Sequence, residues 1–372
     1  MGLLLFLQMS NNFIQNIVKK FNSEDVITFA EKDGFSEIKS WAHSSSGLLD
    51  YNLGTLGFPT GIIELAGKSR SGKTTLGLEG MKNFLKENPE VGIAVILSSE
   101  NRDNKEYAKR LGIDTSKVII IKIRYVESMF LRVKSLIKEC EKYFEENKMG
   151  IPKFYFLWDS LGATLSKSEL DTMDENVATL EKKAAKGDEI TELKHEKIGA
   201  FAKPAKMFAK FLLGEMYSKV IHFIILNHQY DKIGGHGRQS TGGEWIELFP
   251  TIRLQTSIKE NVKVGDEEVA QITVVKVIKN DFGSRRPTDV EILLGYGIVL
   301  SEDEIAFGIE SGIIEKVSAK KHSFLGGKLT WSTKREFYDL YISGNKFLPI
   351  LQKKIRNAYH DVVRYEKIKS DE

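Results

Sequence analysis

Residues 67–75 read Gly-Lys-Ser-Arg-Ser-Gly-Lys-Thr-Thr and constrain the fold more than any other stretch of the chain. They match the pattern G-x-x-x-x-G-K-[ST], with an apolar run at 62–66 before them and helix-forming residues at 76–86 after them. In such a strand–loop–helix unit, backbone N–H groups and the helix N-terminus hold phosphate oxygens. The less specific interpretation is a glycine-rich turn into an ordinary helix. We predict that the chain binds a nucleoside triphosphate through Gly67, Lys68, Ser69, Arg70, Ser71, Gly72, Lys73, Thr74 and Thr75.

Within this loop, the motif assigns Lys73 to the β- and γ-phosphates and the Thr74 hydroxyl to Mg²⁺. Two acids follow apolar runs further along: Glu100 after residues 92–97, and Asp159 after residues 154–158. A carboxylate at the carboxyl end of a parallel strand, beside a phosphate loop, can orient an attacking water or bind the metal. For Glu100 the alternative is a helix cap for the segment 102–111. Asp159 is the candidate second Mg²⁺ ligand.

Composition limits the class of protein. The chain has 372 residues, of which 41% are hydrophobic and 28% charged, so it can form one large domain with smaller additions. One cysteine excludes an internal disulfide and favours a reducing compartment. The net charge of +3 permits basic patches for nucleic acid without arguing for them. The apolar start, residues 2–7, is too short to span a bilayer and lacks a basic flank, so we expect a cytoplasmic protein with no membrane partner.

Several segments predict how the chain is organised. Residues 11–21 have the spacing of a short amphipathic helix, and a β-type run follows at 26–29. This pair is too small to fold alone, so it must dock on its own core or on a neighbouring subunit. Segments 251–258, 269–278 and 288–294 alternate in the manner of an antiparallel meander, and helical spacing returns from residue 301.

Two regions are rich in polar residues. Residues 167–197 are dense in charge and predict either a mobile loop or a solvated helix. Residues 231–243 are glycine-rich and basic, which suits a second mobile loop close to an anionic polymer. Between them, Lys203, Lys206 and Lys210 fall on one face of a predicted helix over 200–217. The ordinary explanation of such a row is a solvated face.

The ordered set of these pieces resembles the RecA family of homologous-recombination ATPases, including its phage branch typified by the UvsX proteins. The resemblance covers roughly residues 44–300 and is weaker in the tail. The phosphate loop alone is shared by many families, whereas the ordered set is more specific. The matching pieces are residues 46–50, 67–76, Glu100 with 107–112, Asp159-Ser160, Asn227-His228, 241–243 and 275–280.

The resemblance implies roles around the nucleotide. Glu100 is the expected water-orienting catalytic residue, and Asp159 shares the Mg²⁺ shell with Thr74. Tyr107 is expected to pack on the adenine, with Asn104 near it.

His228 stands where bacterial members carry a glutamine that senses the γ-phosphate. A histidine there is similar to the phage branch and favours a pH-sensitive hydrolysis reaction. His228 is therefore grouped with Glu100 and Lys73 as a catalytic candidate.

The resemblance also implies that the two polar regions are DNA-binding loops that line a filament axis. On this interpretation the lysine row becomes a phosphate-contacting row rather than a solvated face. Individual contacts of the long first loop cannot be carried over. The candidate DNA-binding residues are Lys203, Lys210, Lys232, Arg238, Gly242 and Gly243.

One departure concerns the subunit boundary. Bacterial members carry two lysines, spaced K-N-K, that reach the γ-phosphate of the neighbouring subunit. Here the sequence is Lys279-Asn280-Asp281, so an acid replaces the second lysine. The candidate trans-acting residues are Lys279, Arg285 and Arg286; the alternative is that hydrolysis depends less on assembly.

The expected fold is α/β: a RecA-like P-loop ATPase core over residues 46–300, whose mainly parallel sheet is extended by antiparallel strands. Residues 1–45 are expected to form an extension and oligomerisation arm, and 301–372 a small C-terminal α/β domain. Neither candidate DNA loop offers an aromatic row, so backbone and lysine contacts are expected to dominate single-strand binding.

The expected function is ATP-dependent pairing and exchange of DNA strands by filaments on single-stranded DNA, with ATP and Mg²⁺ as cofactors. Expected partners are single- and double-stranded DNA, further copies of the chain in a helical homo-oligomer, and mediator and single-strand-binding proteins. For a phage protein the compartment is the host cytoplasm.

Three other functions remain open at this stage. A hexameric RecA-like helicase or motor would form closed rings, against which the docking arm at 11–29 argues. A regulatory paralogue that hardly hydrolyses ATP would not need the intact set Lys73, Thr74, Glu100 and Asp159. A small-molecule kinase with a P-loop would not need two mobile basic loops.

Overall fold

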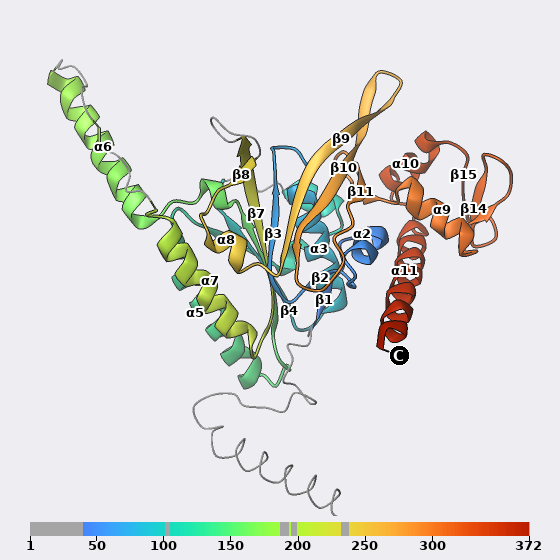
Figure 1. Ribbon diagram of the computed structural model, residues 1–372, viewed down its shortest axis with the longest axis horizontal. Helices are drawn as coiled ribbons and strands as arrows, with labels where there is room; N and C mark the ends of the chain where they lie inside the picture. The colour runs from blue at the N-terminus through green and yellow to red at the C-terminus, as the bar shows by residue number, and fades with distance from the viewer. Residues whose placement is uncertain (1–39, 101–104, 187–192, 195–198, 232–237, 372) are drawn as a thin grey trace, which may run out of the picture. The chain divides into compact units, whose positions relative to one another are not determined.

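The apolar runs predicted as buried strands form the middle of a large sheet (Figure 1). The structure is a computed structural model and describes residues 40–100, 105–186, 193–194, 199–231 and 238–371. Among these residues, ten strands pair in the order β12-β11-β10-β9-β3-β7-β6-β4-β5, with β8 added to the end of β7. A mixed α/β fold with a mostly parallel central sheet is therefore confirmed.

The sheet has a parallel part and an antiparallel part that meet between β3 and β10. Strand β9 is parallel to β3 but antiparallel to β10, so it belongs to both parts. The predicted antiparallel meander is confirmed. The strands of the sheet are β3 (Gly61–Gly67), β4 (Gly92–Ser98), β5 (Val118–Lys122), β6 (Lys153–Asp159), β7 (Val220–Asp231), β8 (Arg238–Ser240), β9 (Ile252–Val264), β10 (Glu267–Asn280), β11 (Thr288–Leu293) and β12 (Gly297–Val299).

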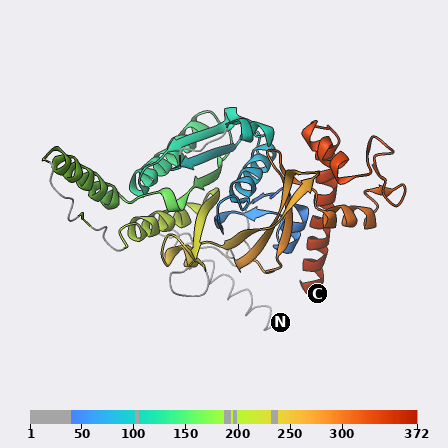
Figure 2. The same cartoon turned by 90° about the horizontal axis from the view of Figure 1, so that it is seen from above.

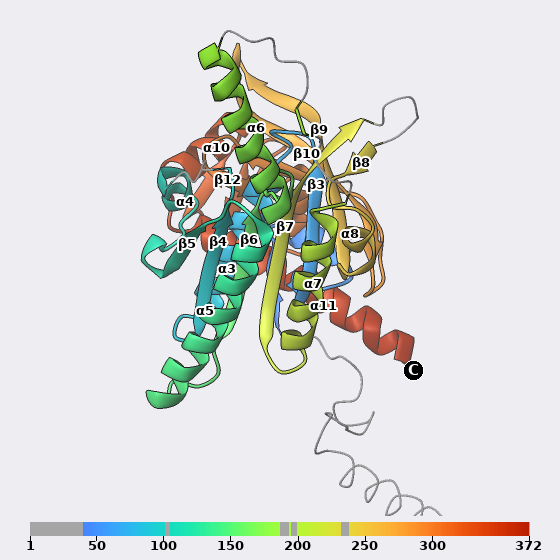
Figure 3. The ribbon, with the colours of Figure 1, turned by 90° about the vertical axis from the view of Figure 1, so that its left-hand side faces the viewer.

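Helices cover both faces of the parallel part. Helix α3 (Lys73–Glu87) packs on one face, and α5 (Val126–Glu146) and α7 (Ala202–Met216) lie side by side on the other (Figure 3). Parallel strands joined by helices need such double cover, which explains their near-continuous apolar runs. The predicted helices at 76–86, 126–146 and 200–217 are confirmed within a few residues.

Strand β6 shows how one apolar run serves both faces. Phe154, Phe156 and Trp158 belong to the core beneath α5 and α7. Tyr155 and Leu157 belong to the core beneath α3. Successive side chains of a strand point to opposite faces, so an uninterrupted apolar run fills two cores at once. The carboxyl end of this strand is therefore held rigidly.

The two polar regions take ordered structure over part of their length. Residues Lys167–Lys186 form α6, a solvated helix that buries only Leu170 among its described side chains and extends away from the sheet (Figure 1). In the second region, β8 pairs antiparallel with the end of β7, so the candidate loop is flanked by a hairpin. Residues 232–237 lie outside the described residues. Two shorter helices of the core are α4 (Lys105–Arg110) and α8 (Trp245–Leu248).

The C-terminal residues gather beside the antiparallel part of the sheet (Figure 2). Helix α9 (Glu302–Glu310) begins with a capping box in which Ser301 and Glu304 bond each other's backbone N–H groups. Val262, Leu293 and Val299 of the sheet share one apolar core with residues of the C-terminal helices. The remaining elements here are β13 (Glu315–Lys316), β14 (His322–Phe324), β15 (Leu329–Trp331), α10 (Lys334–Ile342) and α11 (Leu348–Asp371).

The predicted helix at 11–21 and the β run at 26–29 lie outside the described residues, as does most of the arm expected at 1–45. The described chain starts with β1 (Trp41–Ala42), which pairs with β2 (Phe58–Pro59), and with α2 (Gly47–Asn52) between them. No helix in the part of the chain that the structure describes is both long enough and apolar enough to cross a lipid bilayer.

A buried polar group holds the centre of the sheet. Glu64 of β3 is 1% exposed. Its Oε2 accepts a hydrogen bond from Arg253 Nε of β9 at 2.7 Å, and its Oε1 accepts one from Asn227 Nδ2 of β7 at 2.8 Å. Burial raises the pKa of Glu64, and Arg253 opposes that shift. One carboxylate therefore links three adjacent strands.

We expect Arg253→Met to destabilise the fold by about 3–5 kcal/mol, because the change leaves a buried carboxylate without its cation. Denaturant unfolding measures this loss. Lys259→Met is the matched control: Lys259 is on the same strand as Arg253, and the change breaks only its solvent-accessible pair with Asp289 of β11, so it should change stability little. Equal effects of the two variants would show that Glu64 does not need its partner.

Candidate nucleotide-binding site

The phosphate loop leaves β3 at Gly67 and enters α3 at Lys73. Gly72 has φ 88°, in the left-handed region that favours glycine, and a Cβ there would lie 2.6 Å from Ile292 Cδ1. At Gly67 a Cβ would lie 2.5 Å from the carbonyl oxygen of Thr256. Gly67 is therefore required by the close approach of the β9 backbone, and Gly72 by its positive φ, in addition to any requirement of a ligand.

Lys73 lies under this loop. Its Nζ donates hydrogen bonds to the carbonyl oxygens of Gly67 at 3.0 Å and Lys68 at 2.7 Å. Burial lowers the pKa of Lys73 to about 8, although the carboxylates of Asp159 and Glu100 oppose the shift. The ammonium group is thus held by backbone carbonyls at the place where a phosphate group would stabilise its charge.

Glu100 lies just beyond β4, facing the loop. Its Oε1 accepts a hydrogen bond from the Ser160 hydroxyl and lies 3.1 Å from His228 Nε2. Ser160 in turn is held by Ser99, whose Oγ accepts from the Ser160 backbone N–H at 2.9 Å. Residues within or just after three different parallel strands, β4, β6 and β7, therefore orient one carboxylate.

These groups line one cavity of about 560 Å³. Asp159 at the end of β6 and Thr74 at the start of α3 both border it, so a carboxylate and a hydroxyl are available in the same space. Oxygen ligands of this kind fit Mg²⁺. The structure thus brings together Lys73, Thr74, Glu100, Asp159 and His228 as the sequence predicted.

Tyr107 of α4 borders the same cavity. Its hydroxyl lies 2.6 Å from Thr75 Oγ1, and burial raises its pKa to about 12. An adjoining apolar pocket of about 280 Å³ lies beneath α4 and shares Thr74, Tyr107 and Asp159 with the larger cavity. Asn104, expected beside Tyr107, lies outside the described residues.

The far wall of the cavity comes from the antiparallel part of the sheet, which sequence reasoning missed. Its members are separated from the loop by about half of the chain, and only the register of β9, β10 and β11 brings them there. The sequence signal that could have indicated them is the polar side chains inside these predicted strands. The wall residues are Ile258, Asn261, Glu268, Gln271, Ile292, Leu294 and Gly295.

The candidate DNA-binding residues lie elsewhere. Lys203 and Lys210 are exposed on α7. Gly242 and Gly243 follow β8 with φ of 120° and 79°. Lys232 lies outside the described residues, and for Arg238 the structure describes only the backbone, in β8.

The trans-subunit candidates lie near the other end of β10. Lys279 Nζ donates to the carbonyl oxygen of Leu248 at 2.9 Å and lies 3.5 Å from Asp281 Oδ2. Arg285 and Arg286 are exposed, and the Arg286 guanidinium lies 5.9 Å from the centre of the Tyr51 ring. The structure does not bring these residues to the phosphate loop of the same chain.

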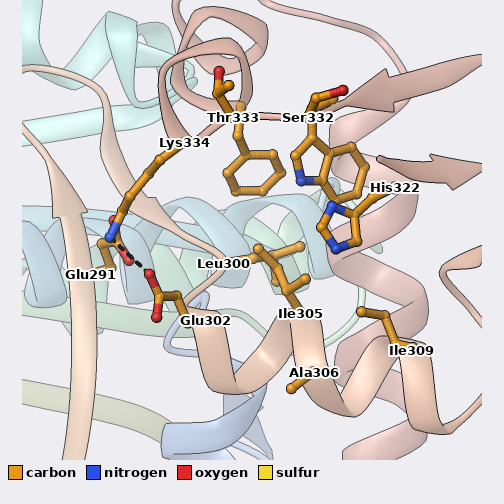
Figure 4. A pocket seen from close by; sticks show the side chains of 12 residues that line it. Glu291, Leu300, Glu302, Ile305, Ala306, Ile309, His322, Ser332, Thr333 and Lys334 are labelled. Carbon is orange, nitrogen blue, oxygen red and sulfur yellow. Dashed lines mark hydrogen bonds and ion pairs between the residues drawn. The ribbon is translucent and has the colours of Figure 1, made fainter. Parts of the chain in front are cut away.

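A separate cavity of about 320 Å³ lies between α9, α10 and the small C-terminal strands (Figure 4). Its wall is mostly apolar, and its cation, Lys334, already lies 3.2 Å from Glu291 and 3.4 Å from Glu302. With its positive charge balanced by two carboxylates, this cavity does not suit a triphosphate.

A phosphate loop at the end of a central strand, with an ordered carboxylate after a neighbouring strand, defines a P-loop nucleotide-hydrolysing protein. Comparison with known proteins agrees: residues 8–140 match the family model described as the RecA N-terminal domain.

The chain is also 27% identical over 318 residues to Protein RecA of Chlorobaculum parvum, covering 84% of this chain and 82% of the relative. It is 27% identical over 308 residues to Protein RecA of Malacoplasma penetrans, covering 82% of each. These matches show that the chain is similar to RecA proteins over most of its length. This similarity supports a RecA-type recombinase with DNA-dependent ATPase activity.

We expect Lys73→Ala to lower ATP turnover at least about 100-fold, the usual cost of removing one positioned donor from a charged transition state. Equilibrium binding of ATP and DNA-stimulated hydrolysis measure the effect. Lys109→Ala is the control, because that lysine is exposed and pairs with Glu106 at 3.8 Å. Normal hydrolysis by Lys73→Ala would contradict the assignment of the loop.

Proposed function

We propose that Glu100 orients and deprotonates the water that attacks the γ-phosphate of ATP. The observation that carries this proposal is the position of its carboxylate, which is held by Ser160 and His228 in the cavity that Lys73 lines. A general base must be fixed within reach of the proton that it accepts, and these two contacts fix Glu100.

The other residues of the cavity bind and position the nucleotide. The backbone of residues 67–75 and the Lys73 ammonium hold the phosphates, and the ring of Tyr107 packs on the base. Thr74 and Asp159 would hold Mg²⁺, which supplies charge neutralisation for the transferred phosphoryl group when it is bound. Asn104 is proposed to lie near the base.

His228 supports the finer proposal that the chain belongs to the phage, UvsX-like branch. Its Nε2 lies 3.1 Å from the Glu100 carboxylate, so it can report the state of the γ-phosphate to the strand that leads into β8.

DNA is proposed to bind along α7 and at the β7–β8 hairpin. Lys203 and Lys210 supply phosphate contacts, Gly242 and Gly243 supply backbone N–H groups, and Lys232 and Arg238 act from the hairpin. Successive copies of the chain form a helical filament, in which residues 1–45 dock on the next copy. Mediator and single-strand-binding proteins are proposed to control loading.

At the subunit boundary, Arg285 is the proposed replacement for the missing lysine. It is exposed, whereas Lys279 bonds the Leu248 carbonyl and lies beside Asp281. Lys279 and Arg286 remain the other candidates. The ATP of one copy would thereby stabilise the contact with the next, since a ligand shifts an equilibrium only through its differential affinity for the two states.

Electron microscopy of Glu100→Gln on single-stranded DNA tests the function. Loss of the base should slow hydrolysis by about 10²–10⁴-fold while ATP binding persists, so filaments should remain stable in ATP. Wild-type filaments should persist only with a non-hydrolysable analogue. Closed rings in both samples would instead identify a hexameric motor.

Replacement of Lys203 and Lys210 by alanine should weaken binding to single-stranded DNA. Each lost phosphate contact lowers the slope of log affinity against log salt by about 0.7, so the pair should lower it by about 1.4. Fluorescence titration over a range of salt concentrations measures the slope. Lys134 and Lys138, exposed on α5, provide the matched double-alanine control. An unchanged slope would show that Lys203 and Lys210 are solvated and do not contact DNA phosphates.

A further inference from the structure

Three potential metal ligands meet where the start of the core contacts the C-terminal helix. His43 precedes α2, Asp50 is part of α2, and His360 is part of α11. One ligand atom from each lies within 4.8 Å of the other two. Asp50 is 0% exposed and His360 is 7% exposed, whereas the side chain of His43 is 14% exposed.

The converging atoms are not satisfied by hydrogen bonds in this arrangement. His43 Nδ1, Asp50 Oδ2 and His360 Nε2 are all buried and have no hydrogen-bond partner among the described residues. Their separations from Asp50 Oδ2 are 3.4 Å for His43 and 3.6 Å for His360, beyond the 2.7–3.2 Å of a good N–H···O bond. Buried polar atoms without hydrogen bonds cost free energy, and here only the contacts of Asp50 with the two imidazoles offset that cost.

The same separations between ligand atoms fit a tetrahedrally coordinated metal ion. Nitrogen and oxygen ligands lie about 2.0–2.2 Å from Zn²⁺, so two ligand atoms of one tetrahedron lie about 3.3–3.6 Å apart. Both measured separations, 3.4 Å and 3.6 Å, are close to this range. The third pair, His43 Nδ1 and His360 Nε2, lies within 4.8 Å.

The surroundings resemble a supported metal site. Asp50 Oδ1 accepts a hydrogen bond from the Ser44 backbone N–H at 3.2 Å. His43 Nε2, on the far side of its ring, lies 3.1 Å from Glu87 Oε1. A carboxylate behind a ligating histidine fixes the orientation and tautomer of the ring.

We propose that His43, Asp50 and His360 form a binding site for one Zn²⁺-type divalent cation, with water as the fourth ligand, that fastens α11 to α2. The two helices are in close contact there: a Cβ on Gly47 would lie 3.0 Å from Arg356 Cα. A bound cation therefore adds a cross-link between residues 50 and 360, at the boundary between the core and the C-terminal elements.

A proton is the competing occupant. Burial lowers the pKa of His43, but Asp50 and Glu87 outweigh burial and raise it to about 9 in the metal-free chain. A proton on Nδ1 and a metal ion exclude each other, because a ligating imidazole must be neutral at that nitrogen. A metal titration therefore distinguishes the two occupants, because a proton that stays on His43 prevents the metal ion from binding.

Titration of the chelator-stripped full chain with Co²⁺, followed by competition with Zn²⁺, tests the site. We expect one Co²⁺ per chain with the absorption bands of tetrahedral cobalt. Asp50→Asn and His360→Gln should each weaken binding at least about 100-fold, the upper range seen for the loss of mere supporting groups around metals. His322→Gln, a partly exposed histidine stacked on Trp331, is the matched control and should bind as the wild type does.

A second measurement distinguishes loss of the metal site from misfolding of a variant. Zn²⁺ should raise the melting temperature of the wild type and of His322→Gln, but not that of His360→Gln, and each variant should still bind ATP if folded. Absence of stoichiometric metal in the wild type, or equal binding by wild type and His360→Gln, overturns the proposal and leaves a protonated His43 beside Asp50.

Discussion

The rest of the structure depends on the buried carboxylate of Glu64, which fixes the strand that leads into the phosphate loop. Its partners, Arg253 and Asn227, belong to the strands on either side. In the same register, Gly67 lies opposite His228 on β7 and opposite Thr256 on β9. A slip of one strand would break a buried ion pair and also move the site, so fold and chemistry are specified together.

The site combines the two kinds of sheet. The parallel part supplies the charged groups, because the carboxyl ends of β3, β4, β6 and β7 meet at one edge. The antiparallel part supplies a wall with few charges. This division explains why the cavity has its phosphate loop and carboxylates on one side and residues such as Ile292 and Leu294 on the other.

Most strands of the parallel part could be predicted from the sequence, because strands buried on both faces appear as uninterrupted apolar runs bounded by turns. Sequence reasoning also chose Glu100 and Asp159, because each acid follows an apolar run downstream of a phosphate loop. It underestimated β9, predicted to end at residue 258, because the strand continues to Val264 through polar residues whose backbone pairs with β10. Pairing carried by backbone rather than by apolar side chains leaves little trace in composition.

The cluster of His43, Asp50 and His360 was beyond sequence reasoning for another reason. Its members have no common motif, and two of them are separated by 310 positions, since 360 − 50 = 310. Only the docking of α11 on α2 brings them together. Long-range contacts of this kind depend on tertiary packing, which periodicity within one element does not encode.

The hydrogen bonds between the phosphate loop and the antiparallel strands have a mechanical consequence. Ser71 Oγ lies 2.6 Å from Thr256 Oγ1, and Gln271 Nε2 donates to the Arg70 carbonyl at 3.2 Å. Beyond these contacts, β9 and β10 continue as a paired ribbon to Lys279, which is anchored to the Leu248 carbonyl. A shift of the loop would therefore act on paired strands of the central sheet rather than on a flexible segment, and those strands lead to the surface around Lys279.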